Sequence, residues 1–269
     1  MKLVHPWFRN MFWVGGFLSL VSSIQLFVLG ERTETFFAWT IQSPLTAATF
    51  GGFYLGAMTY GFLSARELVW AKVRAPALGL FVFTTITLAA SILHLDKFHL
   101  TSPDWLTRTA AQVWMLVYIL LPPLLLITLI LQGRMAGTDP DRMKSFPVWF
   151  RILLLLHGLF GITVACFLFF APQTVIPFWS WALTLLTARV LSAWLFSFGV
   201  ISLQALREHD WTRIRVFAAG YLVAGVLGLI ALLRYPGEVH WFEVGNPGYL
   251  MYIAIMLVIG FAGYSRSRA

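Results

Sequence analysis

Eight apolar stretches of about twenty residues dominate this sequence and leave few choices of fold. As a helix, a stretch of ~20 residues covers the ~30 Å hydrocarbon core of a bilayer. Lipid requires helices, because backbone groups there must hydrogen-bond internally. The sequence therefore predicts an all-α, polytopic integral membrane protein with eight transmembrane helices, at about 10–30, 44–64, 76–95, 109–132, 151–171, 181–203, 215–234 and 247–264.

Composition agrees with this class and disfavours others. Hydrophobic residues make up 59% of the 269 residues and charged residues only 11%, unlike a soluble globular protein. The net charge of +8 lies at the ends of the apolar stretches, so it does not indicate nucleic-acid binding. The first apolar stretch is too long for a signal peptide and is expected to remain as the first helix. The single cysteine, Cys166, allows no intramolecular disulfide.

Lysine and arginine predict the orientation. With a cytoplasmic N-terminus, fourteen of these residues fall in inner segments and four in outer segments, with Arg189 inside a span. Such a bias follows the positive-inside rule. Both termini are therefore expected on the cytoplasmic side of the plasma (inner) membrane.

A motif occurs twice at an offset of 141 residues and indicates an internal duplication. Its members are Arg66, Glu67, Trp70, Arg74 and, in the second copy, Arg207, Glu208, Trp211, Arg215. The same offset continues outward without a gap and pairs His157 with Gly16. Four spans per copy predict two parallel four-helix repeats, 1–135 and 149–269, joined by a cytoplasmic linker at 136–148.

The duplicated motif lies at the cytoplasmic ends of spans and has two interpretations. Arginine and tryptophan at that depth anchor and orient helices without further function. Alternatively, the motif holds an anionic headgroup or an ion pair. In that case Arg66 and Glu67, like Arg207 and Glu208, are expected to pair with the other copy across the central axis.

Small residues predict where the copies meet. Gly52 and Gly56 correspond to Ala193 and Ser197. Small residues four apart let helices approach closely in lipid. The second and sixth spans are therefore expected to pack against each other.

The outer side carries the candidate binding residues Arg189, His94, His99, His240 and Glu238. An ionisable residue within a span is a candidate functional residue. The sequence predicts an outward-facing polar pocket around Arg189, with snorkelling or ion pairing of that residue as the structural alternative. Imidazole and carboxylate also suit zinc, but their spacing matches no metal motif, so no metal ligands are assigned.

No cofactor is predicted. His157 lies inside a span without a second histidine at its depth, which disfavours haem b and favours a hydrogen bond within the bundle. Haem b and zinc remain minor alternatives. Motifs for phosphate binding, zinc proteolysis or a nucleophilic serine are missing, and the sequence favours a non-enzymatic role with no catalytic residue assigned.

Two segments carry a resemblance: Phe37 through Ala47, and Leu186 through Leu191 followed by the second Arg-Glu motif. They resemble bacterial eight-helix membrane proteins that are built from a duplicated four-span unit and have no assigned activity. The layout also resembles haem A synthase, but the paired in-span histidines of that family are missing here.

Three functions stay open. The first is binding or transport of a small anionic or amphipathic ligand in the outer pocket. The second is a membrane scaffold or complex-assembly subunit, which predicts no cavity. The third is a metal- or haem-handling membrane enzyme. Expected partners are the lipid bilayer and, as alternatives, a homo-oligomer or a membrane-protein complex.

Overall fold

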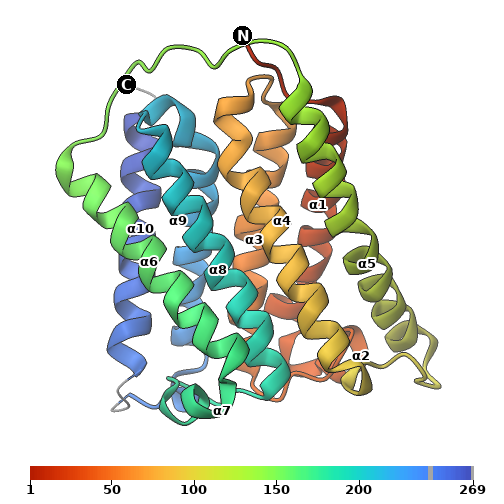
Figure 1. The fold of residues 1–269 in the computed structure, drawn as a ribbon. Coiled ribbons are helices and arrows are strands. Elements are labelled where there is room, and N and C mark those ends of the chain that lie inside the picture. The colour runs from red at the N-terminus through yellow and green to blue at the C-terminus, as the bar shows by residue number, and fades with distance from the viewer. Residues whose placement is uncertain (242–244, 268–269) are drawn as a thin grey trace.

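Long helices joined by short turns make up the protein. The structure, a computed structural model, describes residues 1–241 and 245–267. Its long helices are α1 (Pro6–Ser23), α3 (Pro44–Arg66), α4 (Trp70–Leu93), α5 (Trp105–Arg134), α6 (Val148–Phe170), α8 (Leu185–Glu208), α9 (Trp211–Arg234) and α10 (Gly245–Arg266), and the short ones are α2 (Thr33–Phe36) and α7 (Pro172–Val175). The long helices run side by side, with both termini at one end of the bundle (Figure 1).

Seven helices in the described residues are long and apolar enough to cross a membrane, as expected of a membrane-embedded protein. The exception among the long helices is α3, which is rich in glycine, threonine and tyrosine. Most of its residues are buried against other helices. A helix covered by protein needs less hydrophobicity than one facing lipid, which explains its weaker apolar signal.

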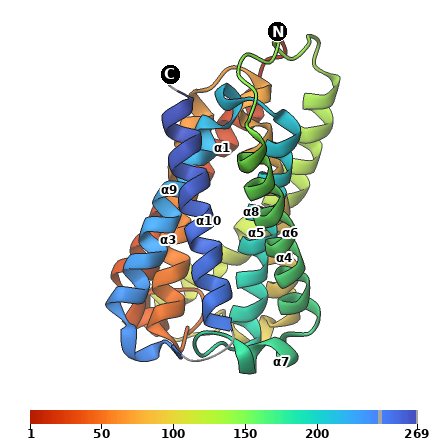
Figure 2. The same cartoon turned by 90° about the vertical axis from the view of Figure 1, so that its left-hand side faces the viewer.

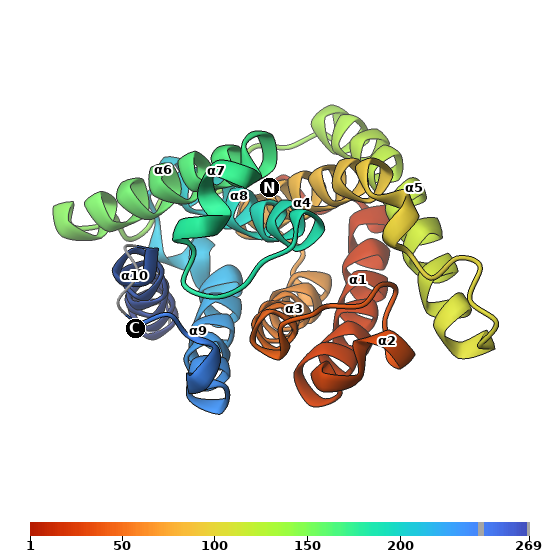
Figure 3. The same cartoon turned by 90° about the horizontal axis from the view of Figure 1, so that it is seen from below.

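Two layers of four helices form the bundle (Figure 3). One layer has the order α1, α3, α9, α10, and the other has the order α5, α4, α8, α6, with neighbours in contact within each layer. The chain changes layer between α3 and α4 and returns between α8 and α9. Residues before and after the 136–148 segment therefore contribute two helices to each layer.

Local sequence sets the helix ends. The Ser43 hydroxyl accepts a hydrogen bond from the backbone of Thr46 at 3.1 Å, and proline follows at the first helical position, so α3 starts where the sequence predicts. Thr184 and Thr187 form the corresponding reciprocal cap at the start of α8. The side chain of Asp210 caps α9. Each cap satisfies backbone N–H groups that would otherwise lack a partner.

Glycine brings α3 and α9 into close contact. A methyl group added at Gly220 would lie 2.7 Å from the carbonyl oxygen of Gly56, and one added at Gly56 would lie 2.7 Å from that of Gly220. In the other layer, the Ser197 hydroxyl on α8 donates to the carbonyl of Gly79 on α4 at 2.9 Å. These backbones approach closely because no side chain separates them.

The expectation that the second and sixth spans pack through small residues is wrong. Gly52 and Gly56 face Leu227 and Ala224 on α9, and Ser197 contacts α4. Large aromatic rings instead bridge α3 and α8, including Phe53 and Tyr54 against Trp194, which is buried with Ala193 in α8. The small residues serve close packing, but toward neighbours within a layer.

We expect Gly220→Ala to destabilise the protein by about 1–3 kcal/mol, because backbone lies on the far side of the added methyl group. Gly15→Ala is the matched control, since its Cβ would meet nothing within 4 Å. That change should stabilise α1 by about 0.5–1 kcal/mol through helix propensity. Thermal unfolding in detergent measures both, and equal effects would contradict the packing argument.

Candidate functional site

Arg189 and His94 meet at the outer end of the bundle. The Arg189 Nε donates to the carbonyl of Phe169 at 3.1 Å, and its Nη1 bonds to the Nε2 of His94. A guanidinium only donates, so His94 accepts and carries its proton on Nδ1. The contact joins the end of α4 to α8 and to the end of α6.

The other predicted outer residues have separate partners. His99 bonds to Thr40 through Nε2 at 3.1 Å and to the carbonyl of Phe37 through Nδ1 at 3.2 Å. Glu238 accepts from the Ser43 hydroxyl and lies at the positive end of α3. The exposed His240 donates its backbone N–H to Ser180 at 2.7 Å. Apart from the Arg189–His94 pair, the described contacts do not bring these residues into one pocket.

The environment of His94 predicts a pH effect. Burial lowers the pKa of His94 from its ordinary value of 6.5, and the charge of Arg189 lowers it further, while Asp96 acts in the opposite direction. Below about pH 6.5 the unfolded chain therefore binds a proton that the folded protein refuses. Stability must fall as the pH decreases through this range.

We expect the melting temperature of the protein to drop between about pH 7.5 and about pH 5.5. The drop should be smaller in His94→Gln, whose amide oxygen can still accept from Arg189 but does not titrate. Thermal unfolding of both proteins at the two pH values checks this. An identical pH dependence would contradict the assignment.

The duplicated cytoplasmic motif forms a buried ion network in only one of its copies. Glu208 is 3% exposed and accepts from Arg213 at 2.7 Å and from Arg74 at 3.4 Å. The corresponding Glu67 is more exposed and pairs with Lys72 at 3.3 Å. Pairing between the copies is thus seen for Glu208 and Arg74, whereas the described ion pair of Glu67 stays within its own copy.

Aromatic rings surround the remaining members of the motif. Trp70 packs on Phe8 at a centroid distance of 5.2 Å, and Trp211 packs on Phe150 at 4.3 Å. The guanidinium groups of Arg66 and Arg215 lie over Trp13 and Tyr264, and the Arg207 carbonyl accepts from Arg142. These contacts fit the anchoring interpretation, in which tryptophan and arginine fix the cytoplasmic ends of helices.

The segment between α5 and α6 is held firmly rather than forming a loose joint. Asp139 pairs with Arg74, and the carbonyl of Pro140 accepts from Arg213. The backbone N–H of Met143 donates to the buried Asp210 carboxylate at 2.7 Å. This strap lies across the second copy of the motif and removes it from water.

We expect Glu208→Gln to cost about 3–5 kcal/mol, because two arginines lose a buried counter-charge. Glu67→Gln is the matched control at the corresponding position, and an exposed pair there should contribute only about 0–1 kcal/mol. Unfolding in detergent measures the two losses. Equal losses would show that burial of the Glu208 network adds nothing.

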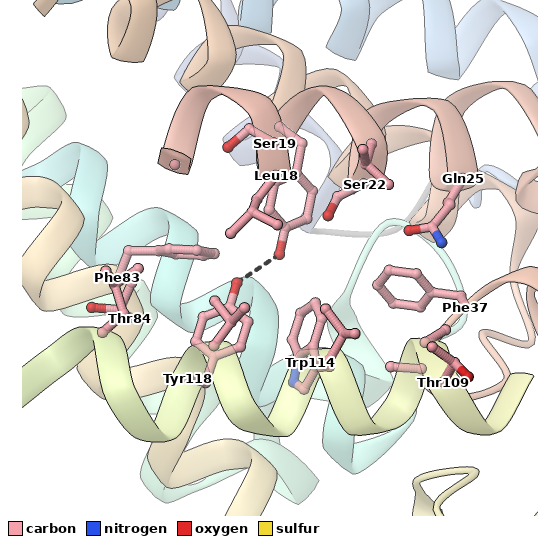
Figure 4. A pocket seen from close by; sticks show the side chains of 18 of the residues that line it. Leu18, Ser19, Ser22, Gln25, Phe37, Phe83, Thr84, Thr109, Trp114 and Tyr118 are labelled. Carbon is pink, nitrogen blue, oxygen red and sulfur yellow. Dashed lines mark hydrogen bonds between the residues drawn. The ribbon is translucent and has the colours of Figure 1, made fainter. Parts of the chain in front are cut away.

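A cavity of about 270 Å³, here called the α1–α5 cavity, lies between α1, α4 and α5. Leu18, Phe37, Phe83 and Trp114 supply apolar wall (Figure 4). Its polar lining side chains are Ser19, Ser22, Gln25, Thr84, Thr109 and the hydrogen-bonded pair Tyr54 and Tyr118. Apolar walls with a few polar groups are typical of a ligand pocket.

The cavity exists because α5 leans away from α1 along its first half (Figure 1). Near the cytoplasmic end the two helices pack, with Leu125 and Leu129 against a cluster containing Phe8 and Phe12. Pro122, which interrupts the backbone hydrogen bonding of α5, lies between this packed part and the cavity-lining residues. The contact is thus confined to one end.

A local irregularity in α1 lies beside the cavity. The helix widens into a π-helical turn at Ile24–Val28, where Gln25 donates to the carbonyl of Phe36 at 2.8 Å. Such turns are rare and frequent at functional sites. The adjacent Gly51 lets α3 approach this turn, since a methyl group there would lie 2.4 Å from the nitrogen of Phe27.

The sequence analysis missed this cavity, although one signal was available. Ser19, Ser22 and Gln25 follow one another at spacings of three and share one face of α1. Polar residues on one stripe of an otherwise apolar span indicate a surface that avoids lipid. The predicted outer residues, by contrast, are missing from the lining of this cavity.

His157 is hydrogen-bonded within the bundle, as predicted. Its Nδ1 lies 2.9 Å from the Ser202 hydroxyl, and its ring stacks on Tyr252. Within residues 1–241 and 245–267, no three histidine, cysteine or acidic residues group to hold a metal ion.

Comparison with models of known protein families, with curated proteins and with solved structures finds no match to the chain.

Proposed function

We propose that this protein binds an amphipathic, lipid-like molecule in the α1–α5 cavity while embedded in the plasma membrane. The observation that carries the proposal is the cavity itself, which is walled mainly by apolar side chains and reaches the surface between two helices. Val21 and Val113 line it and are 38% and 44% exposed. A cavity that reaches a lipid-facing surface admits molecules dissolved in the bilayer.

The surrounding surface supports access from lipid. On α1 the exposed side chains next to the cavity include Val14, Phe17 and Ile24, and on α5 they include Leu116 and Leu120. An apolar surface of this kind is stable next to acyl chains rather than water. The polar groups of the cavity would then bind the head of an amphipathic molecule, while its chain lies against the apolar wall.

The ligand differs from the one the outer residues predicted. Arg189 is engaged by His94 and the Phe169 carbonyl, so the structure gives no argument for an anionic ligand at that position. The amphipathic alternative keeps its support from the α1–α5 cavity. The scaffold hypothesis, which predicts no cavity, loses support.

We further propose that the chain crosses the membrane eight times, with α3 as the eighth span and both termini cytoplasmic. The α3 helix has 23 residues and packs along α1 and α9. An even number of spans places both termini on one side, in agreement with their position in Figure 1. The excess of lysine and arginine at that end supports a cytoplasmic location.

Paired contacts support the proposed duplication. The backbone N–H of Trp70 donates to Lys2, and that of Trp211 donates to Lys144. At the outer end, His99 donates to Ala38 and His240 to Ser180. Each second contact repeats the first at a shift of 141 or 142 residues.

The first helix needs a one-residue gap in this correspondence. Gly16 faces Phe62, and Gly158 faces Leu203, although 62 and 203 differ by 141 while 16 and 158 differ by 142. Under this correspondence, Gly15 rather than Gly16 is the counterpart of His157. The ungapped match expected from sequence therefore fails in the first helix.

A cavity-filling variant tests ligand binding. Gly15 lines the cavity and its Cβ would meet no other atom, so Gly15→Leu should occupy the space without a backbone clash. We expect this variant to lose most labelling of α5 by a phospholipid that carries a photoreactive group on its acyl chain. Labelling is measured in nanodiscs by mass spectrometry of the cross-linked peptides.

Gly133→Leu is the control, because Gly133 is also a helical glycine in open space but does not line the cavity. It should keep wild-type labelling. Equal labelling of α5 in the Gly15→Leu variant and the wild type would overturn the proposed function. Labelling spread evenly over all lipid-facing helices in the wild-type protein would overturn it as well.

A further inference from the structure

A second cavity lies at the opposite edge of the two layers. It has a volume of about 280 Å³ and lies between α6, α8, α10 and the segment that follows α7; we call it the α6–α10 cavity. Figure 3 shows the α6–α10 edge at one side of the bundle and the α1–α5 edge at the other. Figure 2 views the molecule from the α6–α10 side.

The two cavities occupy corresponding places under the proposed duplication. Leu18, Ser19 and Ser22 line the first, and the residues 142 positions later, Phe160, Gly161 and Val164, line the second. Phe37 and Trp179 correspond in the same way. The hydroxyl groups of α1 have thus been replaced by apolar residues on α6, which indicates a different ligand.

Two buried hydrogen-bond donors in the lining of the α6–α10 cavity lack a partner. The Tyr252 hydroxyl and the Trp179 indole N–H make no hydrogen bond, and their side chains are 2% and 8% exposed. The Tyr252 hydroxyl lies beside Gly161, another lining residue, 2.8 Å from where a Cβ would be. Buried donors are nearly always paired, so unpaired ones facing a cavity favour a bound acceptor.

The ring of Tyr252 is held in place by stacking. Its centroid lies 4.1 Å from that of His157, with 13° between the planes. The imidazole is itself fixed by the hydrogen bond to Ser202. A donor fixed in this way offers its hydrogen bond without losing much conformational freedom on binding.

We propose that the α6–α10 cavity binds a lipid-soluble molecule with a planar ring that carries carbonyl oxygens, of the quinone class. Half of its lining residues are aromatic: Phe160, Phe178, Trp179, Tyr249 and Tyr252. Aromatic walls favour a flat ring, and the unpaired donors of Tyr252 and Trp179 match carbonyl acceptors. The inference rests on the membrane location in the proposed function but not on a ligand in the α1–α5 cavity.

Size and access agree with this class of ligand. A volume of about 280 Å³ is near the lower limit of ligand pockets, enough for one substituted ring but not for a long tail. Phe178 and Phe160 line the cavity and are 58% and 39% exposed, so the cavity reaches the surface of the bundle. The tail of a quinone would extend past them into the hydrocarbon.

The test uses decylubiquinone as the probe and Tyr252→Phe as the variant, in detergent-purified full-length protein. Decylubiquinone should raise the melting temperature of the wild-type protein saturably. Tyr252→Phe should weaken its apparent affinity roughly three- to tenfold, because one hydrogen bond to the ligand is lost. Without ligand, this variant should be as stable as the wild type or more stable, since the hydroxyl it removes has no partner.

Tyr221→Phe is the matched control. The Tyr221 hydroxyl donates to the Phe198 carbonyl at 2.6 Å and does not line the cavity. This variant should lose stability without ligand and keep the wild-type affinity for decylubiquinone. The opposite pattern of the two variants separates a ligand contact from a structural one.

Three outcomes would overturn the proposal. The first is no saturable stabilisation of the wild-type protein by decylubiquinone. The second is equal stabilisation by decanol, which would mean that only an apolar chain binds. The third is loss of quinone affinity in Gly15→Leu but not in Tyr252→Phe, which would place the quinone in the α1–α5 cavity and leave the proposed function intact.

Discussion

Two close helix crossings hold the layers together, and the rest of the structure depends on them. In one layer Gly56 and Gly220 bring α3 and α9 into backbone contact, and in the other Gly79 and Ser197 do the same for α4 and α8. Lipid gives helices little hydrophobic reason to associate, so tight packing must supply the attraction. Each crossing joins a helix that precedes the 136–148 segment to one that follows it, so neither part can form its layers alone.

The same crossings explain where the protein is empty. The middle of the bundle is filled by large rings, with Trp194 only 4.1 Å from Phe83 and also against Phe53 and Tyr54. The outermost helices contact fewer neighbours, so their packing is less constrained. Both cavities lie at these edges, between α1 and α5 and between α6 and α10. A rigid centre with open edges suits a protein that binds molecules from the bilayer.

Sequence alone could predict the helices because their signals are local. Apolar length, the Ser43-Pro44 start and the motif before Trp70 and Trp211 each act within a few residues. Helix partners depend on which small face meets which, and glycines occur on α3, α4 and α9 alike, so Gly56 could be assigned to the wrong partner. The α1–α5 cavity depends on how far α5 leans, and no single residue encodes that distance. Arg189 drew attention as an unpaired charge, but its partner His94 lies 95 residues away in the chain.

The differences between corresponding positions indicate that the two edges have separate tasks. Glu208 has become the buried centre of an ion network, and the segment around Asp139 covers it, while Glu67 stays near water. At the cavities, Ser19 gives way to Gly161, and that exchange leaves room for the Tyr252 hydroxyl beside the glycine. An unpaired buried hydroxyl costs stability, so its presence is best explained by a ligand that accepts its hydrogen bond. The cytoplasmic side would then keep the frame fixed, and the two cavities would be free to differ.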